Sequence, residues 1–185
     1  MAYSVEIPYL DKENIEIYLN DLATEIEKAK IGKHSILIVG GAAMALKYED
    51  ERSTVDIDIC FREQNKLYSC CEVITKNYNL PEDWINADVM HSDSFSYKLF
   101  DNAILYKTIG DYLDIYVVDD IDLYCMKIVG LRPKDVEDMN SIAPKLKVKG
   151  VTVEDIENNF ERLYGSKYHL INDEMKLMYV NMQLS

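Results

Sequence analysis

Two aspartates, Asp56 and Asp58, alternate with apolar residues in the segment Val55-Asp56-Ile57-Asp58-Ile59. On a β-strand, side chains two residues apart leave the same face, with α-carbons about 6 to 7 Å apart. Two such carboxylates can hold one or two divalent ions, which neutralise phosphates during phosphoryl-type transfer. The pair alone is a weak indication, because this acidic chain contains a second one, Asp120-Ile121-Asp122, which helix capping explains better.

A glycine pair, Gly40-Gly41, lies between a short apolar run, Ser35 to Val39, and the helix-forming sequence Ala-Ala-Met-Ala-Leu-Lys. This order predicts a strand, a glycine turn and a helix. Without β-carbons, backbone N–H groups can come close to a triphosphate, and the following helix N-terminus favours negative charge. In isolation, a tight turn without a ligand would explain the glycines better. Together with the carboxylates, they predict a site for a nucleoside triphosphate and Mg²⁺ or Mn²⁺.

A third carboxylate from a neighbouring strand usually completes such a metal site, and Asp114 is the candidate. It lies in Leu113-Asp114-Ile115, within the predicted strand Tyr112 to Val118. If its side chain shares the face of Asp56, we expect it to bind the ion on the side of the attacking group. In that place it would help to deprotonate an acceptor hydroxyl.

The elements that must position these residues follow from hydrophobic periodicity and from turn and capping residues. The expected helix caps are Asp11, Asp119 or Asp120, and Thr152 in a capping box with Asp155. Residues 1–118 are expected to form an α+β core, a small mixed β-sheet flanked by helices that include an N-terminal one. Residues 119–185 are expected to form a helical C-terminal part packed on this core in one compact unit. The expected helices are Asp11–Lys30, the segment after Gly41, Gln64–Tyr78, Asp120–Val129, Thr152–Gly165 and Tyr168–Leu184, and the expected strands are Ser35–Val39, Val55–Phe61, Ala103–Thr108 and Tyr112–Val118.

Composition restricts the partners. The 185 residues include 33 acidic and 20 basic ones, for a formal net charge of -13, so the molecule as a whole repels nucleic acid and anionic membranes. Bound metal ions reverse the local charge and would still allow phosphate binding. The four cysteines lack a Cys-x-x-Cys spacing, so we expect buried free thiols. The absence of a signal-like start and of any run of about 18 apolar residues favours a cytoplasmic protein without membrane contact.

The order of a strand ending in Gly-Gly, a helix, a loop and an Asp-x-Asp strand resembles the nucleotidyltransferase superfamily, which has a polymerase-beta-like fold. Within residues 36–138, four segments are similar to a bacterial subgroup of uncharacterised nucleotidyltransferases. That subgroup is similar to the toxins of abortive-infection and toxin-antitoxin systems. The four segments are Val-Gly-Gly-Ala-Ala-Met-Ala-Leu, Arg-Ser-Thr-Val-Asp-Ile-Asp, Asp-Trp-Ile-Asn and Met-Lys-Ile-Val-Gly-Leu-Arg-Pro-Lys-Asp-Val-Glu-Asp.

The resemblance implies that Asp56, Asp58 and Asp114 bind magnesium. The nucleotide contacts that it implies are Gly40, Gly41, Thr54 and Lys127. The chain departs from the family pattern in two ways: fourteen residues separate Gly41 from Asp56, slightly more than is usual, and Gly41 replaces a serine found in many members.

For Lys127 and for the charged residues that follow it, the sequence also allows a purely structural interpretation. Lys127 could equally be a solvated lysine beside Asp122 or Asp138 instead of a nucleotide contact. The charges of Arg132, Lys134, Asp135 and Asp138 fit helix-start charges and surface pairs better than catalysts.

We therefore expect a magnesium-dependent nucleotidyltransferase that moves a nucleoside monophosphate from a nucleoside triphosphate, such as ATP, to an acceptor hydroxyl and releases pyrophosphate. The acceptor stays open among RNA, protein and small molecules. The resemblance also leaves open that the chain is the toxin of a toxin-antitoxin or abortive-infection pair, in which case an antitoxin protein would be a further partner. The alternative is a catalytically silent protein of the same fold that binds a nucleotide or a protein partner.

Overall fold

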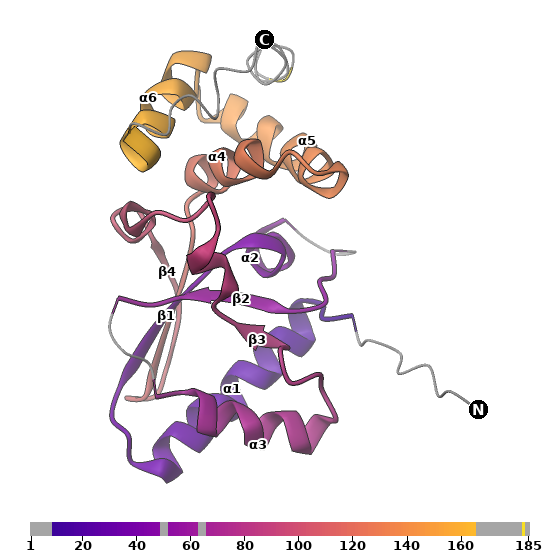
Figure 1. The fold of residues 1–185 in the computed structure, drawn as a ribbon, viewed down its shortest axis with the longest axis vertical. Coiled ribbons are helices and arrows are strands. Elements are labelled where there is room, and N and C mark those ends of the chain that lie inside the picture. The colour runs from indigo at the N-terminus through magenta and orange to yellow at the C-terminus, as the bar shows by residue number, and fades with distance from the viewer. Residues whose placement is uncertain (1–8, 49–51, 63–65, 166–182, 184–185) are drawn as a thin grey trace, which may run out of the picture. The chain divides into compact units, whose positions relative to one another are not determined.

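The computed structural model describes residues 9–48, 52–62, 66–165 and 183. Five strands form one mixed sheet in the order β3-β2-β1-β5-β4, accompanied by helices (Figure 1). The expected α+β class with a small mixed sheet is therefore confirmed. The strands are β1 (His34–Ile38), β2 (Ile57–Cys60), β3 (Ile85–Asn86), β4 (Ile104–Ile109) and β5 (Leu113–Val117).

The chain divides into two compact units, which are described separately. Unit 1 contains the described residues up to Asp88 together with Leu105–Val117, and unit 2 contains Val89–Ile104 and the described residues from Val118 onward. The chain thus enters unit 2 twice, first for residues 89–104 and again after Val117.

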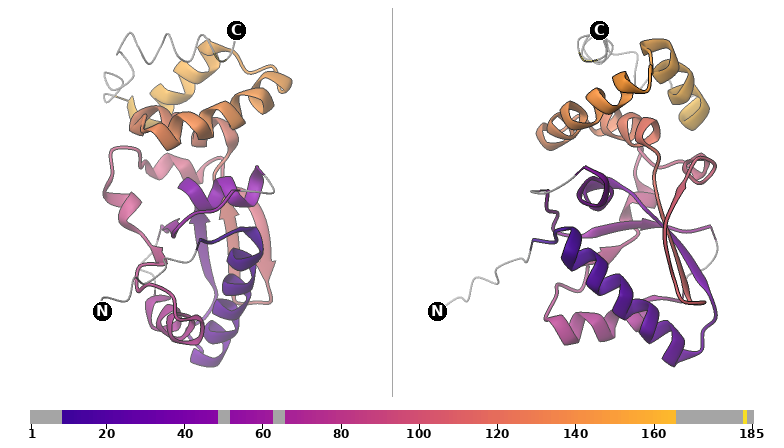
Figure 2. Two further views of the ribbon diagram at one scale, coloured as in Figure 1. Left: turned by 90° about the vertical axis from the view of Figure 1, so that its right-hand side faces the viewer. Right: turned by 180° about the vertical axis from the view of Figure 1, so that it is seen from behind.

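Three helices accompany the sheet in unit 1, namely α1 (Lys12–Ala29), α2 (Gly40–Lys47) and α3 (Tyr68–Tyr78). The side chain of Asp11 caps α1 as expected, because its Oδ1 accepts a hydrogen bond of 2.8 Å from the backbone N–H of Asn14. One face of α1 is buried, and α1 packs against α3 and α2 (Figure 2). Trp84 is completely buried, with its ring edge-on to that of Tyr18.

The register of the strands decides which side chains can meet. Strands β1 and β2 are antiparallel, with Ile38 opposite Ile59. Strands β1 and β5 are parallel, as are β2 and β3, where Asp58 is opposite Asn86. Strand β2 begins at Ile57, later than the expected Val55, so Asp56 lies in the bend just before the strand.

Unit 2 contains helices α4 (Asp120–Gly130), α5 (Pro133–Val148) and α6 (Val153–Tyr164), together with the short 3-10 helix η2 (Tyr97–Phe100). The short 3-10 helix η1 (Asp88–His91) begins on the last residue of the first segment of unit 1. Helix α4 packs against α5 and α6, and η2 packs against α6. The Ser96 hydroxyl donates a hydrogen bond of 2.6 Å to the Leu163 carbonyl, which explains why residues 89–104 belong with these helices.

Several local expectations for the second unit are met. Thr152 and Asp155 form the expected capping box at the start of α6, and Asp119 caps α4. The expected helix Tyr168–Leu184 lies outside the described residues, apart from position 183. All four cysteines are free and buried, as expected. Among the described helices, none combines the length and the apolar character needed to cross a membrane.

Candidate functional site

The turn between β1 and α2 brings the glycine pair against the second aspartate. The Val39 N–H donates a hydrogen bond of 3.1 Å to the Asp58 carbonyl, which extends the β1–β2 ladder up to the turn. Gly40 has φ 62°, in the left-handed region that favours glycine. A β-carbon on Gly40 would lie 2.7 Å from Oδ2 of Asp58, closer than a real contact permits. Only glycine lets this carboxylate lie directly against the turn.

Helix α2 begins at this turn without a side-chain cap. Its N-cap residue is Val39, which has no side-chain acceptor, and Gly40 and Gly41 are the first two residues of the helix. The first N–H groups of a helix have no partners within it and carry partial positive charge. A phosphate oxygen is the kind of group that binds at such a helix end. The Asp58 carboxylate therefore lies beside a helix terminus that can take an anion.

The first aspartate is held by two neighbouring side chains. The Thr54 hydroxyl donates a hydrogen bond of 3.4 Å to Oδ1 of Asp56, and the Asn86 amide donates one of 3.3 Å to Oδ2. Asp56 and Asp58 are both half-buried. A carboxylate oxygen has two lone pairs, so one donor on each oxygen of Asp56 leaves further capacity on both. Asp56 is thus ordered and keeps lone pairs that a cation can use.

Thr54 is buried and contacts the first aspartate. Its side chain is only 3% exposed, and its backbone pairs with Leu10 in an isolated antiparallel bridge, with hydrogen bonds of 2.9 and 2.6 Å. The hydroxyl is oriented toward Asp56, as the 3.4 Å contact shows. The expected place of Thr54 beside the nucleotide phosphates stays a prediction, and in the structure its hydroxyl donates to Asp56.

Asn86 also belongs to the candidate site, although nothing in the sequence pattern assigned it a role there. It lies within the Asp-Trp-Ile-Asn segment, which carried part of the family resemblance but no chemical signal of its own. Only the parallel pairing of β2 with β3, which places Asn86 level with Asp58, reveals its position. Pairing between strands this far apart in sequence cannot be derived from periodicity alone.

The structure corrects the assignment of Asp114 as the third metal ligand. On β5 it is level with Ser35 on β1, whereas Asp58 pairs beyond Ile38 at the other end of β1. Three residues of strand alone amount to about 10 Å, and β1 lies between β2 and β5 in the sheet. Asp114 instead forms an ion pair of 2.8 Å with Lys33.

The pKa of Asp114 agrees with this structural role. Burial raises the pKa, but the Lys33 ammonium and the Thr108 hydroxyl, which donates a hydrogen bond of 2.8 Å, stabilise the ionised form more strongly. The pKa of Asp114 therefore lies below its ordinary value. The Asp114 carboxylate on β5 thus links Thr108 on β4 to Lys33, the residue just before β1.

Lys127, expected at the nucleotide, is a buried ion-pair residue of unit 2. Its side chain is 7% exposed, and its ammonium lies 3.2 Å from Oδ1 of Asp135 and 2.7 Å from Oδ2 of Asp138. Lys127 thus has the expected partner Asp138, and Asp135 has the expected place at a helix start. Both carboxylates are buried, so the expected exposure of the lysine and of these pairs to solvent is wrong. The Lys127 ammonium is occupied by holding α4 to α5.

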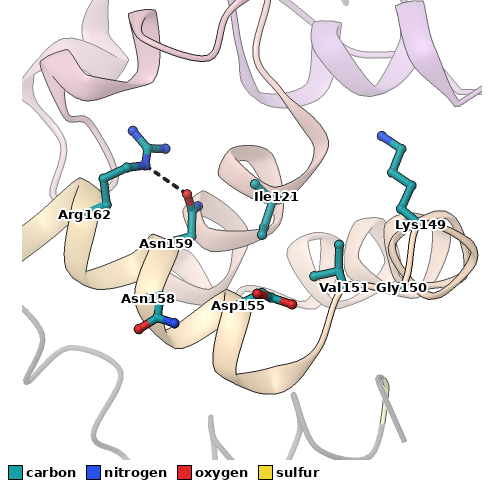
Figure 3. A pocket seen from close by; sticks show the side chains of 8 residues that line it. All are labelled: Ile121, Lys149, Gly150, Val151, Asp155, Asn158, Asn159 and Arg162. Atoms are coloured by element: carbon teal, nitrogen blue, oxygen red, sulfur yellow. Dashed lines mark hydrogen bonds between the residues drawn. The ribbon is translucent and has the colours of Figure 1, made fainter.

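A pocket of about 510 Å³ opens within unit 2, between the start of α4, the α5–α6 loop and α6 (Figure 3). Lys149 and Arg162 lie on opposite sides of it. Both cations are already paired: Lys149 with Asp120 at 2.6 Å, and Arg162 with the buried Asp122. Because these charges cancel, the pocket offers no excess positive charge for a phosphate. The candidate site is therefore the region of unit 1 around the β1–α2 turn, Asp56 and Asp58, which we call the corner of unit 1.

The donor chemistry at this corner fits a magnesium ion in part. Magnesium prefers oxygen ligands and commonly takes one or two protein carboxylates together with substrate phosphates and water. Asp58 supplies such oxygens next to the α2 terminus, and Asp56, two residues earlier, supplies others beside Asn86. Within the part of the chain that the structure describes, no three His, Cys, Asp or Glu side chains form a group able to hold a metal ion. Substrate phosphates and water are the usual sources of further oxygen ligands at such a site.

Comparison with known proteins gives one match. A family model described as nucleotidyltransferase of unknown function (DUF6036) matches residues 18–180. No curated protein and no solved structure matches the chain. The matched region includes the glycine turn, both aspartates and Asn86.

Proposed function

This chain belongs to the family of nucleotidyltransferases of unknown function, and we propose that it transfers a nucleoside monophosphate from a nucleoside triphosphate to an acceptor hydroxyl, in a magnesium-dependent reaction that releases pyrophosphate. One observation carries the proposal. The Asp58 carboxylate lies against Gly40 at the start of α2, whose N-cap residue Val39 makes no side-chain cap, and Asp56 lies two residues earlier in the chain. A carboxylate therefore lies beside a helix end of the kind that binds phosphate.

Different residues would bind the metal ion and the triphosphate. Asp56 and Asp58 would hold the metal ion, and the backbone N–H groups at Gly40 and Gly41 would orient the triphosphate. When bound, the ion neutralises charge on the phosphates and stabilises the transition state. The acceptor oxygen forms a bond to the α-phosphorus, the bond from that phosphorus to the bridging oxygen breaks, pyrophosphate leaves, and solvent takes up the hydroxyl proton.

A transfer assay tests the proposal directly. Purified protein is incubated with each α-labelled nucleoside triphosphate, Mg²⁺ and, in separate reactions, RNA, a protein extract and small hydroxyl compounds. We expect label to appear in one acceptor class with wild type and to be absent with the Asp56→Asn/Asp58→Asn double variant. The charge of -13 favours a small or protein acceptor over a long RNA.

A catalytically silent nucleotide-binding protein is the second candidate. It is favoured by one specific observation, the absence of a third carboxylate among the described residues of the corner. In this case wild type would bind a nucleoside triphosphate in the presence of Mg²⁺, the double variant would not, and no acceptor would be labelled. The same two preparations therefore distinguish the two functions.

Because the described residues of the site include two carboxylates and not three, we predict that the metal ion binds together with the nucleotide. Mn²⁺ alone should bind weakly, whereas Mn²⁺ with a non-hydrolysable triphosphate should bind at least about tenfold more tightly, because the phosphates supply the missing oxygens. Free Mn²⁺ measured by electron paramagnetic resonance reports both affinities. Equal Mn²⁺ affinity with and without nucleotide would contradict the prediction.

A second prediction concerns the glycine turn. Gly40→Ala should weaken nucleotide binding at least about tenfold, because the new β-carbon displaces the Asp58 carboxylate from the turn. Gly110→Ala is the matched control: Gly110 also has a positive φ, of 54°, but its β-carbon would meet the Tyr112 ring at 3.2 Å. Both variants should lose about 1–2 kcal/mol of stability through backbone strain.

Titration with a fluorescent nucleotide, alongside urea denaturation, measures the binding and stability effects separately. Only Gly40→Ala should change the nucleotide affinity. If the two variants bind nucleotide equally well, the contact between Gly40 and Asp58 has no role in binding.

A further inference from the structure

The side-chain amide of Asn86 is fixed at both ends. Its Nδ2 donates hydrogen bonds to Oδ2 of Asp56, at 3.3 Å, and to the Asp83 carbonyl, at 3.2 Å. Its Oδ1 accepts a hydrogen bond of 3.0 Å from the Asp88 N–H. Acceptors on one side and a donor on the other define which end of the amide is nitrogen. The amide therefore presents an N–H group to Asp56.

The short strand that carries Asn86 is anchored firmly. The Ile57 N–H donates a hydrogen bond of 2.7 Å to the Trp84 carbonyl, two residues before Asn86. The Trp84 ring is completely buried, and its Nε1 donates a hydrogen bond of 2.9 Å to the Thr75 hydroxyl. Although β3 has only two residues, Asn86 is thus presented from a rigid support.

Asn86 also occupies the position beside Asp58 on the neighbouring strand. A carboxylate in this place would add a third negative charge next to two others, whereas an amide is neutral and can donate. Thr54 supplies a second neutral donor to the other oxygen of Asp56. Each carboxylate oxygen of Asp56 thus accepts a hydrogen bond from its own neutral donor, Thr54 or Asn86.

From this arrangement we propose that Asn86 and Thr54 are positioning residues, which together fix the Asp56 carboxylate in the orientation that binds the metal–nucleotide complex. This inference rests on the proposed function. Each residue donates to one oxygen of Asp56 and leaves a lone pair on it for the ion. Residues that orient a metal ligand in this way change metal affinity by about 10- to 100-fold when they are replaced.

The test is a double-mutant cycle in the full chain. We compare wild type, Asn86→Ala, Asp56→Asn and the combined variant for binding of Mn²⁺ with a non-hydrolysable triphosphate. Asn86→Ala should weaken binding about tenfold in the wild-type background. With Asp56→Asn it should have less than about a twofold effect, because the group through which it acts has been changed. A purely structural role would weaken binding equally in both backgrounds.

A second pair of variants, at Thr54, tests the same inference without changing β3, which Asn86→Ala could disrupt. Thr54→Val removes the hydroxyl and keeps the shape, whereas Thr54→Ser keeps the hydroxyl. We expect weaker binding with Val and near wild-type binding with Ser. Equal effects in both backgrounds of the cycle, or equal binding by the Val and Ser variants, would overturn the inference. Failure of wild type itself to bind Mn²⁺ and nucleotide would overturn the proposed function and this inference together.

Discussion

Replacing Asp58 with Asn is expected to lower nucleotidyl transfer at least about 100-fold, while the protein stays folded. The substitution keeps the size of the side chain beside Gly40 and removes the charge that would hold the metal ion. Metal ions contribute several kcal/mol to transition-state stabilisation, and each 1.36 kcal/mol corresponds to about a tenfold change in rate. Transfer of label from a nucleoside triphosphate measures the effect, and circular dichroism checks the fold.

Asp114→Asn provides the matched control, because it is the same change in the same sheet. Asp114 pairs with Lys33 and Thr108, away from the β1–α2 turn. We expect this variant to keep wild-type transfer and to lose at most about 1 kcal/mol of stability, since Lys33 is half-exposed. Loss of transfer in Asp114→Asn, or its retention in Asp58→Asn, would show that the catalytic carboxylates have been assigned incorrectly.

Local patterns were sufficient to predict the half of the site that is contiguous in sequence. The apolar run, the glycine pair and the helix that follows are one local unit, and the structure contains it as β1, the turn and α2. The caps at Asp11 and Thr152 were predictable for the same reason, because each involves residues within three positions. Such features depend on nearby residues and not on the path of the rest of the chain.

The other half of the site depends on strand order and register. Asp114 and Asn86 both lie on strands, and apolar neighbours made Asp114 the more attractive ligand. The sheet places β5 and β3 on opposite sides of the β1–β2 pair, and the register brings Asn86, not Asp114, level with Asp58. Such long-range pairing is set by the packing of the whole core, so a single sequence does not reveal it.

Burial was the second property that the sequence did not reveal. Lys127 lies on a helix with charged neighbours, a pattern that suits exposed charges as well as buried ones. In the structure, Asp135 and Asp138 are both buried around its ammonium. Arg132 also donates to Asp135, at 2.8 Å from Nε. A charge cluster of this kind needs two helices in contact, which hydrophobic periodicity does not specify.

Lys127→Met is expected to destabilise the protein by about 3–5 kcal/mol, because it removes the cation from two buried carboxylates while keeping a side chain of similar length. This is a large share of the roughly 5–15 kcal/mol that stabilises a typical domain. Burial raises the pKa of Asp135, but Arg132 and Lys127 outweigh it and hold the pKa below its ordinary value. The stability that Asp135 contributes is therefore present at neutral pH and is lost as the pH falls through this lowered pKa.

Urea denaturation at neutral and acidic pH measures this effect, and Lys149→Met is the control. Lys149 also pairs with a buried aspartate, Asp120, but its side chain is 53% exposed, so its loss should cost no more than about 1 kcal/mol. The difference in stability between wild type and Lys127→Met should narrow at acidic pH, because wild type then loses the stability that the ionised Asp135 contributes. A Lys127→Met variant that is as stable as wild type but binds nucleotide more weakly would contradict this prediction and indicate that Lys127 contacts the nucleotide.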